Sequence, residues 1–376
     1  MEIKNLSGGL SLNPNNEDFL AMQTQNDNTP PSYDDVFQYA KDLNYGELHF
    51  KIDKKTGLFA VVAIHSTKLG PAIGGCRCIP YASTQAAITD AVRLAYGMSY
   101  KAAICELPHG GAKAVLMRPP VIANRQAYFQ SFAEFVNELN GRYVTAMDSG
   151  TDVNDMDIIA TKTRYVTCTS EGGGGDPSPF TALGVKRGIE AAVKFKLGQD
   201  NLRDVHVAIQ GAGHVGYYLA RDLVEAGARV TMADINTANL ERCKNEFKIE
   251  IVSPESIYEI NCDVFAPCAL GAGLNATTIP RLNTTIVAGA ANNQLKDIDE
   301  DDKLLFERGI LYAPDFLINS GGLIYAASVY DHGNFEQAKN HILNIYDALI
   351  KIFTRAKAEH KPTNHIAQVI ADERLY

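Results

Sequence analysis

Residues 205–234 constrain the possible folds more than any other part of the chain. The apolar residues 205–210 predict a buried strand, Gly211-Ala212-Gly213-His214-Val215-Gly216 follows, and residues 229–233 predict a second strand that ends at Asp234. In this pattern the first glycine permits a tight turn, the second lets backbone N–H groups approach a pyrophosphate, and the third lets helix and strand pack. The order strand, G-x-G-x-x-G, helix, strand, acid therefore predicts a doubly wound domain that binds a dinucleotide.

The acid and the residue after it indicate which dinucleotide binds. Asp234 should accept hydrogen bonds from the ribose hydroxyls and repel a 2′-phosphate, and Ile235 supplies no cation to hold one. We therefore expect NAD rather than NADP. The cofactor contacts expected from this segment are the six residues 211–216 named above, Asp234 and Ile235.

Further apolar segments complete this domain. Together with the two strands above, residues 250–252, 263–266, 285–288 and 310–313 give the six strands of a complete doubly wound sheet. Such sheets bind ligands beyond the carboxyl ends of their strands. We therefore expect ligand contacts from Ala269 and Leu270, which follow the fourth strand, and from Asn292 and Asn293, which follow the fifth.

Two lysines lie in an apolar stretch, residues 97–116. Lys101 and Lys113 are surrounded by Ala, Ile, Cys, Val and Leu, and lysines are rarely buried without a partner. Burial would lower the pKa of one ammonium toward ~7–8, where it can act as a base, while the other could hold a carboxylate. The alternative is that both lie on solvated strand edges. We expect short strands to carry both lysines, with a tight turn at Gly110-Gly111 before the second.

The segments before residue 150 predict a mixed α/β domain. Its expected strands are 47–53, 58–65 and 143–147, with a turn at Gly57 in the first pair, and its expected helices are 83–98 and 125–139. Residues 69–75 contain too much glycine to continue a strand and suit a close approach of backbone to a ligand. Asp148 follows the strand 143–147. It either caps the next helix or belongs to a functional site, in which case Asp152 or Asn154 is the cap.

The chain divides at residues 171–179, where four glycines and two prolines predict an interdomain hinge. We therefore expect an α/β fold of two domains: a substrate/catalytic domain at 33–170 and a Rossmann-type NAD-binding domain at 171–345. Helices in residues 346–376 should cross back to the first domain. Residues 1–32 cannot bury enough apolar surface to offset their ordering entropy, so they predict a mobile tail.

Charge and cysteine usage exclude several classes of partner. A net charge of -9 argues against binding to nucleic acid or an anionic membrane, which leaves small molecules and copies of the chain itself, as a homo-oligomer. No apolar run reaches the ~18 residues of a membrane span, and the N-terminus lacks the basic region and apolar block of a signal peptide, so we expect a cytoplasmic protein. The seven cysteines are scattered as reduced thiols would be, and Cys76-x-Cys78 lacks a second pair at zinc-like spacing. We expect no metal site.

The second lysine lies in a motif that resembles the glutamate/leucine/phenylalanine/valine family of amino-acid dehydrogenases. The motif is an apolar residue, two free positions, Gly-Gly, a small residue and the catalytic lysine, here Leu107, Gly110, Gly111, Ala112 and Lys113. The resemblance runs from about residue 33 to near the C-terminus and is closest to the leucine and phenylalanine branch. The sequence departs from the pattern at Pro119, in a turn away from the chemistry.

This resemblance implies a role for each polar candidate. Lys101 holds the substrate α-carboxylate while the α-hydrogen leaves as hydride to the nicotinamide. Lys113 activates the water that attacks the resulting iminium, and Asp148 relays protons to the departing ammonia. Thr181 reaches the nicotinamide end of the cofactor. Asn292 lies beside the nicotinamide and Asn293 beside the substrate.

The resemblance also implies an apolar substrate pocket. Ile73 stands where glutamate-specific members carry a lysine, and the neighbouring Gly74 and Gly75 belong to the same loop. The remaining pocket residues implied are Met98, Ala146, Leu323 and Ala326. We therefore expect NAD-dependent oxidative deamination of leucine, valine or isoleucine, with phenylalanine or tryptophan as the alternative substrate. A non-catalytic NAD-binding or amino-acid-sensing protein is the other alternative.

Overall fold

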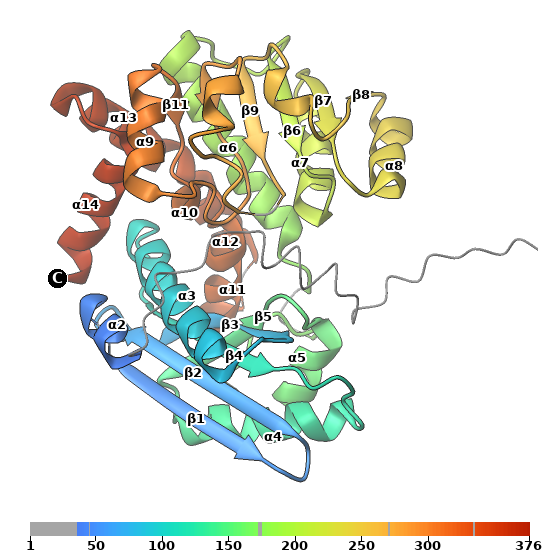
Figure 1. Cartoon of the computed structure of the whole chain (residues 1–376), viewed down its shortest axis with the longest axis vertical. Coiled ribbons are helices and arrows are strands. Elements are labelled where there is room, and N and C mark those ends of the chain that lie inside the picture. The colour runs from blue at the N-terminus through green and yellow to red at the C-terminus, as the bar shows by residue number, and fades with distance from the viewer. Residues whose placement is uncertain (1–35, 45, 172–174, 270, 334) are drawn as a thin grey trace, which may run out of the picture.

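The computed structural model describes residues 36–44, 46–171, 175–269, 271–333 and 335–376. Two sheets covered by helices form the two halves of the molecule, and helix α11 (Gly321–His332) lies between them (Figure 1). The predicted α/β class with two domains is confirmed. The predicted tail, residues 1–32, and the predicted cofactor contact Leu270 lie outside the described residues. In the part of the chain that is described, no helix is long and apolar enough to cross a membrane.

The first sheet positions two of the predicted site residues, Lys113 and Asp148. In spatial order its strands are β1 (Glu47–Asp53), β2 (Leu58–Ser66), β4 (Gly110–Met117), β3 (Ala72–Ile79) and β5 (Tyr143–Met147). Its helices are α2 (Val36–Asp42), α3 (Thr84–Ile104), α4 (Arg125–Glu138) and α5 (Val153–Ala160). Alternate residues of β2 face opposite sides of the sheet, so Val61 packs in one apolar cluster with α3 and Val62 in another with α4. The predicted strands at 47–53, 58–65 and 143–147 are confirmed, as is the left-handed turn at Gly57, with φ +77°.

Three local predictions for this sheet are wrong. Lys101 lies on helix α3 rather than on a strand, because the apolar helical period continues past Gly97 through the buried Ala102 and Ala103. Gly74 and Gly75 lie inside β3, and Gly110-Gly111 opens β4 instead of forming a turn. These glycines serve close packing: a Cβ on Gly74 would lie 1.7 Å from the carbonyl oxygen of Ala112.

The second sheet has the predicted doubly wound topology. In spatial order its parallel strands are β11 (Leu311–Tyr312), β10 (Ile286–Val287), β9 (Val264–Pro267), β6 (His206–Gln210), β7 (Arg229–Ala233) and β8 (Glu250–Ile251). Its helices include α6 (Ser178–Leu197), α7 (His214–Glu225), α8 (Thr237–Phe247), α9 (Ile298–Glu307) and α10 (Asp315–Ile318). Val207 and Ala208, adjacent on β6, belong to apolar clusters on opposite faces, so both faces of the sheet are covered.

The C-terminal helices contact both sheets. They are α11, α12 (Phe335–Leu343), α13 (Ile345–Glu359) and α14 (Thr363–Leu375), and Asn344 separates α12 from α13. Helix α14 packs against α3, where the hydroxyl of Tyr100 donates to Asp372 at 2.5 Å. This contact places α14 beside the helix that carries Lys101.

Candidate active site

Lys113 and Asp148 form a buried ion pair at the centre of the first sheet. Lys113 lies on β4 and is 7% exposed, and Asp148 directly follows β5. Strand β3 runs between these two strands, and at Gly75 an added Cβ would lie 2.8 Å from the Cβ of Asp148. The glycine therefore leaves the room in which the two side chains meet across the intervening strand.

A second cation, Arg77, also faces the carboxylate. Its Nε lies 3.7 Å from Oδ2 of Asp148, while its Nη1 donates to Asp90 at 2.9 Å. Burial alone would raise the pKa of Asp148, but the charges of Lys113 and Arg77 outweigh it and hold that pKa below its ordinary value. Sequence reasoning missed Arg77, although a single charged residue within a buried strand was a signal for it.

Asp148 is not the cap of the following helix. The N-cap of α5 is Asp152, whose side chain accepts from the backbone N–H of Asp155 in a reciprocal capping box. The alternative that Asp148 caps this helix is therefore wrong, and its carboxylate faces Lys113 and Arg77 instead.

Lys101 reaches from α3 to the second sheet. Its ammonium donates to Oδ1 of Asn319 at 2.6 Å and to Oδ1 of Asn292 at 3.1 Å, and the two asparagines are themselves joined by a 2.8 Å hydrogen bond. Burial lowers the pKa of Lys101 to about 8, against the opposing effect of the Asp315 carboxylate. Because its direct partners are neutral amides, the ammonium remains able to take up a carboxylate. Asn319 was not predicted from the sequence as part of the site.

The predicted apolar pocket residues are buried or half-buried. Ala146 and Ala326 share one apolar cluster, and Leu323 packs against a second cluster that contains the fully buried Ile73. Met98 lies on α3 one turn before Lys101 and is half-buried. None of these side chains carries a charge or a hydrogen-bond donor.

The predicted nucleotide loop has the backbone that a pyrophosphate requires. Gly211 has φ +114°, a Cβ on Gly216 would lie 2.1 Å from the carbonyl oxygen of Gly211, and a Cβ on Gly213 would meet no atom within 4 Å. The first and third glycines are therefore needed for packing, and the second leaves open space before the N-terminus of α7. Asp234 accepts from the backbone N–H groups of Ala212 and Asn236, which fixes the carboxylate at the end of β7.

The remaining predicted cofactor residues lie at the same edge of the second sheet. His214 opens α7, with its side chain 84% exposed and 3.5 Å from Asp176, and Val215 follows it. Ile235 is 81% exposed. Thr181 is in the first turn of α6, where its hydroxyl donates to the carbonyl of Pro177 at 3.2 Å. Ala269 follows β9.

A cavity of about 240 Å³ lies at this loop, and several of its lining residues were not predicted from the sequence. They are Asp176, Tyr217, Tyr218, Asn239 and Arg242, contributed by the hinge and by α7 and α8. Arg242 stacks over the ring of Tyr217 at 4.0 Å and pairs with Glu246 at 3.0 Å. Tyr217 and Tyr218 directly follow the glycine motif, whereas tertiary packing brings Asp176, Asn239 and Arg242 to the loop, so no pattern in the sequence marks those three.

Comparison with known proteins identifies relatives along most of the chain. Residues 44–165 match the family model of the Glu/Leu/Phe/Val dehydrogenase dimerisation domain, and residues 231–361 match that of the glutamate/leucine/phenylalanine/valine dehydrogenases. The chain is 46% identical to the leucine dehydrogenase of Thermoactinomyces intermedius, over 90% of this chain and 93% of that one. It is 42% identical to the valine dehydrogenase of Streptomyces coelicolor, over 86% of this chain and 90% of that one. The crystal structure of L-tryptophan dehydrogenase from Nostoc punctiforme superposes with a TM-score of 0.78 at 38% identity, covering 90% of this chain and 98% of that one.

Proposed function

The chain belongs to the glutamate/leucine/phenylalanine/valine dehydrogenase family and is an amino-acid dehydrogenase for apolar substrates, and we propose that it catalyses the NAD-dependent, reversible oxidative deamination of leucine, valine and isoleucine. The observation that carries the proposal is the buried Lys113–Asp148 pair beside the amide-bound ammonium of Lys101. A spectrophotometric screen for NADH formation with each of the twenty L-amino acids tests it. Absence of turnover with every apolar amino acid would favour the non-catalytic alternative.

Each polar residue is assigned the role that its surroundings suit. Lys101 exchanges its amide partners for the substrate α-carboxylate, and Asn293 borders the substrate beside it. Lys113, acting as a neutral amine, takes a proton from the water that attacks the iminium carbon, since a neutral amine is a competent base. Asp148, held ionised by two cations, accepts and returns protons on the way to the departing ammonia.

The nucleotide loop suits a dinucleotide, and we propose that it holds NAD. When bound, NAD accepts the α-hydride of the amino acid. The N–H groups at the start of α7 would hold its pyrophosphate, Asp234 and Ile235 its ribose, and Thr181, Ala269 and Asn292 its nicotinamide end. We further propose that residues 33–170 form the substrate domain and 171–345 the NAD domain, with 346–376 crossing back.

Removal of Arg77 is expected to move the pH profile. In Arg77→Gln, Asp148 loses one of the two charges that lower its pKa, so that pKa rises and the carboxylate is protonated at higher pH than in the wild type. Any part of the acidic limb of the kcat profile that the protonation of Asp148 sets should therefore move to higher pH. Arg77→Lys keeps the charge and should largely retain the wild-type profile. An unchanged acidic limb in Arg77→Gln would show that Asp148 does not titrate in the reaction.

Asp234 is expected to set the choice of cofactor. Its carboxylate next to a 2′-phosphate would bring two negative charges together, so the wild type should prefer NAD by ~100-fold or more in kcat/KM. Ile235 is 81% exposed and can accept a cation, so the double variant Asp234→Ser/Ile235→Arg should lower that preference at least ~10-fold. The control is Val121→Arg, which adds the same charge to the first sheet's half at a residue that is 77% exposed. It should leave the preference for NAD unchanged. Equal wild-type efficiency with both cofactors would overturn the assignment.

We propose that copies of the chain associate through β1. This strand is at the edge of the first sheet, paired with β2 alone among the described strands, and it exposes 50% of Phe50 and 62% of Ile52. It lies within residues 44–165, which match the dimerisation-domain model. Phe50→Lys/Ile52→Lys should therefore dissociate the oligomer in sedimentation velocity, whereas Val121→Lys should not. An unchanged sedimentation coefficient in the double variant would place the interface elsewhere.

The proposed location is the cytoplasm. All seven cysteines are free thiols, and six of them are buried. Free thiols in this number suit a reducing compartment.

A further inference from the structure

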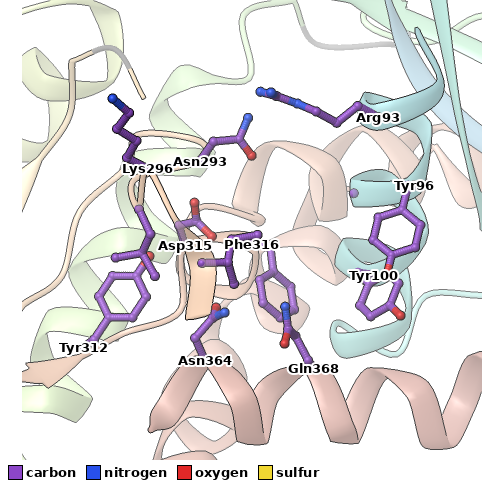
Figure 2. Close-up of a pocket in the computed structure, with 13 residues that line it drawn as sticks. Arg93, Tyr96, Tyr100, Asn293, Lys296, Tyr312, Asp315, Phe316, Asn364 and Gln368 are labelled. Carbon is purple, nitrogen blue, oxygen red and sulfur yellow. The ribbon is translucent and has the colours of Figure 1, made fainter. Parts of the chain in front are cut away.

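A cavity outside the lysine–carboxylate site lies where α3, α14 and the segment after β10 meet (Figure 2). Its volume is about 220 Å³, which at ~30 Å³ per water is room for about seven waters or one small organic molecule. Lys101, Lys113 and Asp148 do not line it, and of the residues proposed to bind the substrate Asn293 alone does. One wall comes from the first sheet's helix α3 and the other from the second sheet's half, so a bound molecule would touch both halves.

The body of the cavity is apolar and largely aromatic. Tyr96 and Tyr100 project from α3 with their ring centroids 4.6 Å apart, and Phe316 and Leu295 line it from the other half. Figure 2 shows the two tyrosines on one side of the space and Phe316 between them and Asp315. Such walls suit a flat or branched apolar group.

Two cations border this apolar space without ion pairs of their own. Figure 2 shows Arg93 and Lys296 extending from opposite sides. Neither forms a salt bridge with any residue that the structure describes. Asp315 also lines the cavity; its carboxyl accepts from the backbone N–H of Gln294 at 3.0 Å, and burial raises its pKa, which favours the neutral form. The lining therefore sets two cations against one buried carboxyl group.

Two further features of the cavity favour a bound ligand: the buried hydroxyl of Tyr312 and the glycine at position 97. The hydroxyl of Tyr312 is buried at the cavity wall and has no hydrogen-bond partner of normal geometry among the described residues. A buried hydroxyl without a partner is costly, and a ligand oxygen would satisfy it. Gly97 lies in the interior of α3, where glycine is a poor helix former, and a Cβ there would meet no atom within 4 Å. The cavity occupies the space that a larger residue at this position would fill.

We propose that this cavity binds a small organic carboxylate with an apolar body. The carboxylate lies between Arg93 and Lys296, the body packs against Tyr96, Tyr100 and Phe316, and the hydroxyl of Tyr312 provides a hydrogen-bond donor. The site is distinct from the substrate carboxylate position at Lys101. Because the occupant contacts α3 and the second half together, it stabilises their association.

The test is a calorimetric titration of the full chain with 3-phenylpropanoate. The titrated protein is Lys101→Ala, which lacks the ammonium assigned to the substrate carboxylate, so the remaining binding reports on the second cavity. We expect saturable binding of one molecule per chain. Adding Arg93→Gln should weaken it at least tenfold, whereas Arg203→Gln, which removes an exposed arginine before β6, should leave it unchanged.

Gly97→Leu provides an independent variant, because its side chain would fill the cavity, and it should abolish this binding. Circular dichroism and thermal unfolding verify that each variant is folded. If Gly97→Leu does not fold, the titration of the Arg93→Gln variant alone tests the proposal. Absence of saturable binding to Lys101→Ala, or binding that survives Arg93→Gln, would overturn the inference. This binding does not depend on turnover. A wild type that binds 3-phenylpropanoate in this cavity but shows no dehydrogenase activity would contradict the proposed function and leave the proposed cavity site intact.

Discussion

Lys113→Ala is expected to lower kcat by ~10²–10⁴-fold, the range for loss of a general base, while NAD still binds. The substitution should affect kcat and leave NAD binding intact, because Lys113 is on β4 of the first sheet and the nucleotide loop joins β6 to α7 of the second. The lysine is 7% exposed and its ammonium contacts Asp148 directly, so no solvent base can take its place without rearrangement. Single-turnover kinetics with leucine and a separate NAD titration by fluorescence measure both quantities.

A folding defect must be separated from a chemical one in this variant. Removal of Lys113 leaves the buried carboxylate of Asp148 with Arg77 as its remaining cation, at 3.7 Å, which should also destabilise the protein. The double variant Lys113→Ala/Asp148→Asn removes both charges and should regain thermal stability while remaining inactive. Lys54→Ala, on the exposed hairpin turn, is the matched lysine control. Near-normal turnover in Lys113→Ala would remove the residue from the mechanism.

The fold of the second half of the molecule could be predicted, because the sequence features that indicate it are adjacent in the chain. A buried strand, the glycines of the nucleotide loop and Asp234 follow one another directly, and each has a fixed geometric purpose in the β6–α7–β7 unit. The predicted strands were accordingly correct in number and close in position. The cavity residue Arg242 was not predictable, since α8 brings it to the loop through tertiary packing that leaves no fixed spacing in the sequence.

The fold of the first half was harder to predict from the sequence, because its glycines are required by contacts with residues that are distant in the sequence. Glycine in a sequence normally predicts a turn, yet Gly74 lies within a strand, where a Cβ would collide with the backbone of Ala112 on the neighbouring β4. The predicted helix ended at residue 98 and Lys101 was placed on a strand, although the buried Ala102 and Ala103 continue the helical period of α3 through Ile104. Arg77 could have been recognised as the one charged residue of a buried strand, whereas Asn319 can be recognised only once the loops of the second half are assembled.

The substrate pocket is expected to reject charged amino acids and to favour leucine over phenylalanine. Its proposed walls, Ile73, Ala146, Leu323 and Ala326, offer neither a charge nor a donor, so the side chain of glutamate would be buried without a partner. That burial costs several kcal/mol, and we expect kcat/KM for glutamate to be lower than for leucine by ~10³-fold or more. The preference among apolar side chains is smaller, because each methylene in such a pocket is worth only ~1–3 kcal/mol.

Leu323 and Ala326 have opposite effects on that smaller preference, and a single substitution can separate them. Leu323 narrows the pocket from the first turn of α11, whereas Ala326, one turn further along, is small enough to admit a ring. Leu323→Ala should therefore raise kcat/KM for phenylalanine relative to leucine by ~10-fold or more. Leu197→Ala removes the same side chain at a site 39% exposed at the end of α6, and it should leave the ratio unchanged. A wild type that prefers glutamate would refute the pocket assignment. A wild type that prefers phenylalanine tenfold would retain the mechanism and place the enzyme among the aromatic-specific dehydrogenases, because the charge and proton-transfer groups are the same for both substrates.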